Sequence, residues 1–355
     1  MKKSRLLGAA LVAALWLGLS LFTWVKPADA ISDSERRPLA QFPEWNMEFM
    51  SKFEDYTLDQ FPLRDGFRKL KAGFHYYLLG QQDNNGIVLQ DGHAAKLEMT
   101  LNEISLQNAL KKFQSIYDAH LQDSTVHAVV VPDKGYYLED YPTLDYDRFY
   151  TLVREGMPYA THVDLRDTLS LDDYYRTDAH WRQENLLDAA GVICEALGVA
   201  APNGEDYRVT ALDRPFYGVY YGQAALPMAA DTLRLMESEL LAQCVVTNYE
   251  TGKTGTVYDM SKLDSKDLYD VFLSGAKSLL TIENPNAATD KELIVFRDSF
   301  GSSIVPLLVK DYAKVTLVDL RYMHMSMLKN FLEFKGQDVL LLYSTLVLNN
   351  SSTIK

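Results

Sequence analysis

Cysteine is scarce in this chain, and positive charge is outnumbered by negative charge. The 355 residues include two cysteines, Cys194 and Cys244, too few for a disulfide framework or an all-cysteine zinc site. One disulfide between them stays open, although we expect two buried thiols. Lysine and arginine number 35 against 48 acidic residues, a net charge of −13. This balance argues against a nucleic acid or an anionic lipid surface as the main ligand.

Internal repeats and low-complexity tracts are also absent, and only one hydrophobic run is long. Residues Leu6–Val25 carry no charge, and three of the first five residues are basic. A run of about 20 apolar residues can cross a bilayer, and basic residues before it keep that end in the cytoplasm. We therefore expect residues 31–355 to be exported. The length of the run favours a retained membrane anchor, and signal-peptide cleavage after Ala30 is the alternative.

Changes in composition divide the chain into three parts. Residues 1–30 form the signal peptide or anchor, residues 31–82 a tether and helical segment, and residues 83–355 one domain. Within this domain, residues of about 205–260 are rich in tyrosine, threonine and glycine, which predicts a β-rich insertion.

Four short apolar runs indicate that the domain is built on a parallel sheet. They cover residues 126–131, 293–296, 315–318 and 339–343, and each is typical of a strand buried on both faces. Helical stretches at 303–310 and 323–334 follow the second and third runs, so the pattern predicts βαβ units and an α/β fold. In such a sheet, reactive groups belong at the carboxyl ends of the strands.

A candidate nucleophile follows one of these runs. Ser299 lies in the segment Arg297-Asp298-Ser299-Phe300-Gly301-Ser302-Ser303, between the run at 293–296 and the next helical stretch. A serine in a strand-to-helix turn is close to free backbone N–H groups that can stabilise an oxyanion. Gly301 leaves room beside a bound acyl group. Helix capping by Ser302 or Ser303 is the structural alternative.

A candidate acid and base occur earlier, in Tyr174-Tyr175-Arg176-Thr177-Asp178-Ala179-His180-Trp181, directly before a predicted helix at 183–197. Acyl transfer by serine needs a histidine that takes the hydroxyl proton and a carboxylate that orients the histidine. Asp178 and His180 fit these roles, although a helix cap and a structural histidine are the alternatives. Asp319, which ends the run at 315–318, is the alternative acid. No second histidine lies at ligand spacing, so we expect no metal.

Together these segments resemble the bacterial DHHW proteins, relatives of the SGNH-hydrolase-like domains in exported alginate O-acetyltransferases. The resemblance covers about residues 35–350 and rests on the motifs around Asp178, Ser299 and Tyr343-Ser344-Thr345. It implies a flavodoxin-like SGNH-hydrolase fold in which Asp-x-His precedes the serine. By position, Ser299 would be the nucleophile, His180 the base and Asp178 its orienting acid. Ala179 stands where the family name expects a histidine.

Three polar residues follow other predicted strands and could reach the same edge of the sheet. Lys134 and Arg321 could bind an anionic sugar or phosphate, and Asn349 could join the oxyanion hole. A solvated or capping role is the alternative for each.

The resemblance implies an exported O-acyltransferase or esterase that moves acetyl groups on a cell-envelope or extracellular polysaccharide through an acyl-serine. It implies no cofactor, and a membrane-bound O-acyltransferase as the partner that delivers acyl groups. The alternative is a catalytically inactive polysaccharide-binding or scaffold protein of an envelope acylation system.

Overall fold

The computed structural model describes residues 2–355, which divide into two compact units. The first comprises residues 2–88 and 219–228. Its elements are α1 (Lys2–Val25), α2 (Phe49–Asp59), α3 (Arg64–Gly73), a π-helical turn (Phe74–Leu78), β1 (Asp83–Asn84) and α7 (Val219–Ala224). Residues Leu6–Val25 of α1 are long and apolar enough to cross a membrane, by length and composition alone.

The segment expected to be a tether is held against the end of α2. The buried side chain of Gln60 bonds the backbone N–H and carbonyl of Asp29 and the carbonyl of Ala40. Arg37 forms a bidentate ion pair with Asp59 at 2.8 and 2.6 Å. These contacts fix residues 29–40 within the first unit, so this part of the chain is not a free linker.

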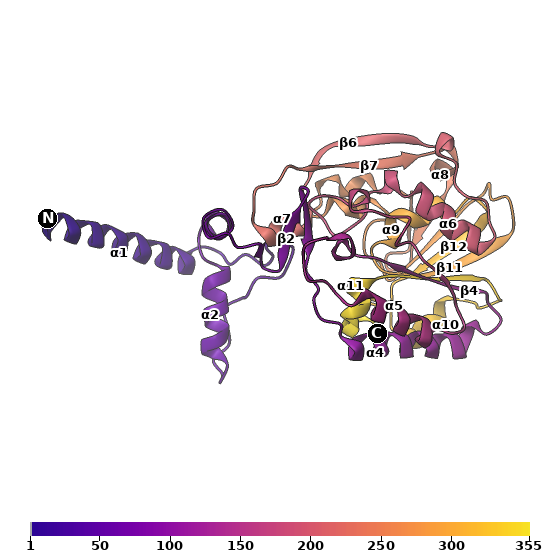
Figure 1. Ribbon diagram of the computed structural model, residues 1–355, viewed down its shortest axis with the longest axis horizontal. Helices are drawn as coiled ribbons and strands as arrows, with labels where there is room; N and C mark the ends of the chain where they lie inside the picture. Colours follow the sequence, from indigo (N-terminus) through magenta and orange to yellow (C-terminus); the bar gives the residue numbers. More distant parts are fainter. Residues whose placement is uncertain (1) are drawn as a thin grey trace. The chain divides into compact units, whose positions relative to one another are not determined.

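The second unit, residues 89–218 and 229–355, is built on an eight-stranded sheet (Figure 1). The strand order is β5-β4-β13-β11-β12-β10-β8-β9. The first five strands in this order are parallel to one another, and β10, β8 and β9 each pair antiparallel with the strand before them. Their bounds are β4 (Val126–Val131), β5 (Thr161–Val163), β8 (Val245–Asn248), β9 (Lys253–Gly255), β10 (Leu279–Glu283), β11 (Lys291–Arg297), β12 (Tyr312–Val318) and β13 (Asp338–Ser344).

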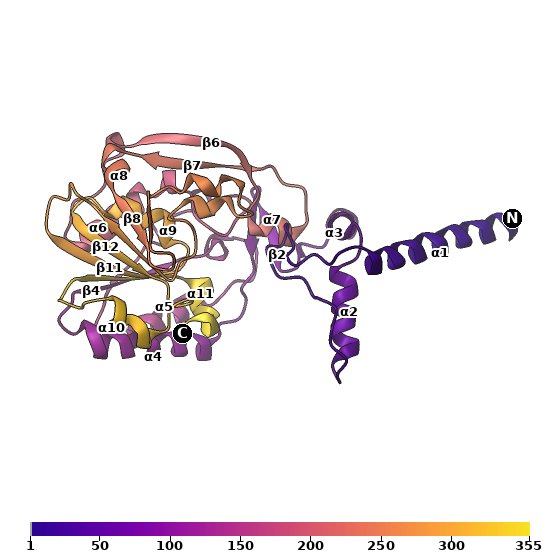
Figure 2. The ribbon, with the colours of Figure 1, turned by 180° about the vertical axis from the view of Figure 1, so that it is seen from behind.

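Helices cover both faces of this sheet, because alternate strand residues are apolar on each side. Leu293 and Val295 of β11 belong to the core shared with α6 (Leu187–Leu197) and α9 (Gly301–Ile304). Ile294 and Phe296 belong to the opposite core, with α4 (Glu103–Ile116), α5 (Tyr146–Gly156) and α10 (Leu328–Phe331). Figure 2 shows the two helical layers from behind. The expected α/β architecture, a mostly parallel sheet flanked by helices, is confirmed.

Two expectations about local structure need correction. In the expected insertion, β6 (Arg208–Phe216) and β7 (Asp231–Glu237) form a separate antiparallel pair, whereas β8 and β9 join the main sheet. The helices predicted at 303–310 and 323–334 are each one short turn of α-helix joined to a 3₁₀ turn. Pro306 contributes to the shortening of the helix predicted at 303–310, since a proline lacks the N–H that would continue an α-helix.

Candidate functional site

The structure brings Asp178, His180 and Ser299 into one hydrogen-bonded chain. His180 Nε2 lies 2.7 Å from Ser299 Oγ, and His180 Nδ1 lies 2.5 Å from Asp178 Oδ1. A carboxylate can only accept, so Nδ1 carries the proton and Nε2 is the acceptor for the serine hydroxyl. Asp178 is buried, whereas Ser299 and His180 are partly exposed. The side chains that would react therefore face solvent, and the orienting carboxylate does not.

The turn that carries Ser299 is fixed by the two residues that precede the serine, Arg297 and Asp298. Asp298 is buried, and its carboxylate accepts the N–H of Phe300 at 3.0 Å and that of Ser344, on β13, at 2.7 Å. Arg297 is also buried and donates to the Asp298 carbonyl and the Ser302 hydroxyl. Burial lowers the pKa of the Arg297 guanidinium below its usual value.

Gly301 was expected to leave room for a bound acyl group, but in the structure it leaves room for the side chain of Arg297. A Cβ at this position would lie 2.8 Å from the Arg297 Cβ, so a side chain would collide with the buried arginine and not with a bound acyl group. The Gly301 N–H also donates to the Asp298 carbonyl at 3.2 Å, within the turn. Gly301 therefore allows the turn to close over Arg297.

The loop that carries the acid and base is held by the β6–β7 pair. Asp231, the first residue of β7, accepts the N–H groups of Arg176 and Thr177 and the Thr177 hydroxyl. The Thr177 hydroxyl oxygen in turn accepts the N–H of Gly218 at 2.9 Å. A Cβ on Gly218 would lie 2.2 Å from the Asp178 Cβ, so only glycine permits this approach. The insertion thus supports the candidate site directly.

Lys134 holds the same loop from the other side, which corrects its expected role as an exposed ligand. The side chain is buried, with 1% of its surface exposed. Its Nζ donates to the carbonyl oxygens of Ala94, Tyr175 and Asp178 at 2.5, 2.6 and 3.0 Å, and lies 3.3 Å from that of Arg176. Burial lowers the pKa of Lys134 to about 7, against the opposing effect of nearby carboxylates. Lys134 is a positioning residue.

The other two expected ligands are also engaged elsewhere. Arg321 forms a bidentate ion pair with Asp319, at 3.0 Å from Nε and 2.7 Å from Nη2. Asp319 is therefore occupied, and the carboxylate beside His180 is that of Asp178. The buried amide of Asn349 accepts the N–H of Asn102 and donates to the Thr100 carbonyl. Asn349 fixes the entry to α4 and is not an oxyanion donor.

Tyr269 is a component of the site that the sequence did not reveal. Its ring stacks on the His180 imidazole, with centroids 4.0 Å apart and planes 11° from parallel. Its hydroxyl lies 2.7 Å from Ser303 Oγ, which also accepts the Trp181 indole N–H at 2.9 Å. Tyr269 lies in a 3₁₀ turn (Leu268–Val271) without a motif, so no sequence signal distinguished it from the other tyrosines. The stacked ring fixes the plane of the imidazole.

Metal chemistry gains no support from the described part of the chain. Among residues 2–355, no group of three or more histidine, cysteine, aspartate or glutamate side chains is placed to hold a metal ion. Cys194 and Cys244 are buried free thiols, and burial raises their pKa values to about 12 and 11. Both thiols are therefore protonated and inert at neutral pH.

Comparison with known proteins agrees with the fold and with the sequence motifs. The family model described as "DHHW protein" matches residues 160–318, which include Asp178, His180 and Ser299. A DHHW family protein from Eubacterium siraeum shares the fold with a TM-score of 0.64 at 20% identity, over 77% of this chain and 95% of that one. PatB1 from Bacillus cereus gives 0.60 at 16% identity, over 74% and 96%. A second PatB1 structure, with a sulfonyl adduct, gives 0.57 at 16% identity, over 74% and 95%.

Comparison with curated proteins gave no match in sequence. The resemblance predicted from the motifs is nevertheless confirmed by two independent findings, the match over residues 160–318 and the shared fold. In sequence and in fold, this chain resembles the DHHW proteins.

Proposed function

We propose that this protein is an exported serine-dependent O-acyltransferase or esterase that acts on acetyl groups of a cell-envelope or extracellular polysaccharide. The observation that carries the proposal is the chain of hydrogen bonds from Asp178 through His180 to Ser299. A serine hydroxyl is a weak nucleophile, and a neutral imidazole at 2.7 Å is the group that activates it. The motif resemblance to polysaccharide acetyltransferases supplies the substrate class.

In the first half-reaction, Ser299 Oγ attacks the carbonyl carbon of an acyl ester while His180 Nε2 takes the hydroxyl proton. The carbonyl π electrons move to oxygen and form a tetrahedral oxyanion. When this intermediate collapses, the bond to the leaving alkoxide breaks, and His180 returns the proton to that oxygen. The product is an ester of Ser299 together with a free alcohol. Asp178 holds the Nδ1–H throughout and stabilises the imidazolium that forms.

In the second half-reaction, a sugar hydroxyl or water gives its proton to His180 and attacks the acyl-Ser299 carbonyl. The Ser299 oxygen leaves and recovers the proton, which restores the starting site. A sugar acceptor gives acyl transfer, and water gives hydrolysis. A partly exposed His180 is accessible to either acceptor.

The hydrogen bonds of the turn point to one oxyanion donor. The N–H groups of Phe300, Gly301 and Ser302 donate to Asp298 Oδ1, the Asp298 carbonyl and the Ser299 carbonyl. No described residue accepts a hydrogen bond from the Ser299 N–H. We therefore assign the Ser299 N–H as an oxyanion donor, in place of the expected Asn349.

Export and the acyl source complete the proposal. The apolar helix at Leu6–Val25 supports delivery of the domain across a membrane, as an anchor or as a cleaved signal. A membrane-bound O-acyltransferase that carries acyl groups outward would then supply the donor, as the motif resemblance implies.

Covalent labelling of Ser299 tests the proposal. The folded protein is treated with an arylsulfonyl fluoride or with an activated acetate ester, and the adduct is located by peptide mass spectrometry. A sulfonyl reagent is a reasonable probe because PatB1 has been solved with a sulfonyl adduct. We expect one adduct, on Ser299, which is lost in Ser299→Ala and His180→Ala. Ser326→Ala, at an exposed serine outside the site, is the control and should label normally.

The competing function is a catalytically inactive polysaccharide-binding or scaffold protein. Ala179 favours it, because the family name expects a second imidazole at this position. Correctly folded protein that takes up neither reagent on Ser299 would contradict the acyl-serine mechanism and favour the scaffold.

A further inference from the structure

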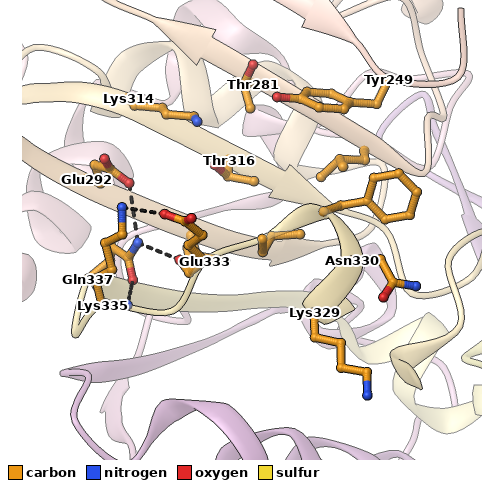
Figure 3. Close-up of a pocket in the computed structure, with 14 residues that line it drawn as sticks. Tyr249, Thr281, Glu292, Lys314, Thr316, Lys329, Asn330, Glu333, Lys335 and Gln337 are labelled. Atoms are coloured by element: carbon orange, nitrogen blue, oxygen red, sulfur yellow. Dashed lines mark hydrogen bonds and ion pairs between the residues drawn. The ribbon is translucent and has the colours of Figure 1, made fainter. Parts of the chain in front are cut away.

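A cavity of about 450 Å³ lies on one face of the sheet, between the strands and the segment at 329–337 (Figure 3). Its floor is formed by Thr281 of β10, Ile294 of β11 and Thr316 of β12. Its walls include the exposed rings of Tyr249 and Phe331. Cavities that hold small ligands have this size.

The residues that line the cavity carry one more positive than negative charge, Lys314, Lys329 and Lys335 against Glu292 and Glu333, in a protein that is acidic overall. Lys314 and Lys329 line it, and among the described residues no carboxylate lies within 4 Å of either ammonium. Glu333 pairs with Lys335 at 2.5 Å, whereas Glu292 accepts from the neutral amide of Gln337 and keeps its charge. Glu292 and Glu283 are the cross-strand neighbours of Lys314, so Lys329 is the lysine of the cavity without a carboxylate in register with it. In Figure 3, the Lys314 ammonium and the Tyr249 hydroxyl point toward one another across the cavity. A ligand with a negative charge is therefore favoured.

Thr281 gives a second, independent indication of a ligand. Its side chain is 2% exposed, and its hydroxyl has no hydrogen-bond partner among the described residues. Buried polar groups are normally paired, so an unpaired hydroxyl in a cavity wall needs an explanation. The hydroxyl is buried as it stands, so a rotation about the Cα–Cβ bond is needed before it can bond a ligand.

We propose that this cavity binds an acidic sugar unit of a glycan, with its carboxylate on Lys314. The sugar ring would pack on Tyr249 or Phe331, because the C–H face of a sugar is apolar, and ring hydroxyls would bond Thr281 and Thr316. Ile294 in the floor precedes Ser299 by five residues, and β11 ends at Arg297, so the two residues lie at most about 17 Å apart. The cavity is thus separate from the acyl site, yet near enough for one polymer to occupy both. That last step rests on the proposed function, whereas the binding itself does not.

Binding of trigalacturonic acid to the full-length protein in detergent tests the site, with neutral maltotriose as the comparison. Titration calorimetry should give saturable binding of the acidic trisaccharide and weaker binding of the neutral one. Lys314→Gln should weaken binding about tenfold, as expected for one charged hydrogen bond. Lys253→Gln, which removes the same charge from an exposed lysine on β9, should leave affinity unchanged.

Thr281→Val keeps the shape of the side chain and provides a second variant that we expect to fold. It should raise the melting temperature of the unliganded protein, since an unpaired hydroxyl is removed, and weaken trisaccharide binding. Equal losses in Lys314→Gln and Lys253→Gln, or equal affinity for both trisaccharides, would overturn the proposal. Binding is also measured in Ser299→Ala: if it persists while wild-type Ser299 takes no label, the acyl-transfer function fails and this site stands.

Discussion

Replacement of Lys134 by methionine tests how the loop with Asp178 is held. The ammonium has three protons, and the carbonyl oxygens of Ala94, Tyr175 and Asp178 lie 2.5, 2.6 and 3.0 Å from Nζ. Methionine has a similar length but donates nothing, so up to three buried carbonyl groups lose a donor, at about 1–3 kcal/mol each. Relief from burying a charge offsets part of this loss. We therefore expect the free energy of unfolding to fall by about 3 kcal/mol.

For a domain of this size, such a loss lowers the melting temperature by about 6–12 °C. Circular dichroism measures the transition, with Lys253→Met as the control at an exposed lysine. The rate of Ser299 labelling should also fall at temperatures where the variant is folded, because the loosened loop carries Asp178. If Lys134→Met melts and labels like the wild type, the carbonyl contacts do not hold the loop and the reasoning is refuted.

The same pair of proteins gives a pH dependence with a defined sign. Burial lowers the pKa of Lys134 to about 7 from the ordinary value of 10.5. Between these two values the unfolded chain binds more protons than the folded one, so a rise in pH favours the folded state. The stability of the wild type relative to Lys134→Met should therefore increase from pH 7 to pH 9 in urea unfolding. A difference that shrinks over this interval would contradict the assignment.

Four further outcomes are expected, three from the site and one from the apolar helix at the amino terminus. Asp178→Asn should leave the fold intact and reduce turnover of an activated acetate ester by up to about 10⁴-fold, through the wrong imidazole tautomer. Tyr269→Leu should slow acylation of Ser299 about fivefold in stopped-flow assays, since the stacked ring stabilises the imidazolium that forms on His180. Gly218→Ala should abolish labelling and lower the melting temperature, because its methyl group would lie 2.2 Å from the Asp178 Cβ. Residues 31–355 should be cleaved by protease added to intact cells, and complete protection until lysis would contradict export.

The sheet and the candidate acid, base and nucleophile could be predicted because their signals are local. Four apolar runs of strand length correspond to β4, β11, β12 and β13, and parallel strands present their carboxyl ends at one edge. Ser299 and the loop of His180 adjoin that edge, so their meeting required no knowledge of side-chain packing.

The supporting residues could not be predicted, because their roles depend on burial and on distant partners. A lysine after a strand usually faces water, and nothing near Lys134 in the sequence reveals four carbonyl groups around its ammonium. Gly301 is needed because a Cβ at this position would collide with Arg297, and this contact exists only once the turn is formed. Tyr269 reaches His180 from a segment without hydrophobic periodicity.

The position of β13 has a consequence for the order of assembly. It is the last strand along the chain, yet it lies in the middle of the sheet, between β4 and β11. Its Ser344 N–H also holds the carboxylate of Asp298, beside the nucleophile. A chain that has emerged only as far as Ser299 therefore contains all three reactive side chains but neither the central strand nor the anchor of the turn. If the chain crosses a membrane from its amino terminus, reactivity would appear only after residues 338–344 have arrived on the far side. Segments still inside the cell would have no assembled nucleophile to acylate.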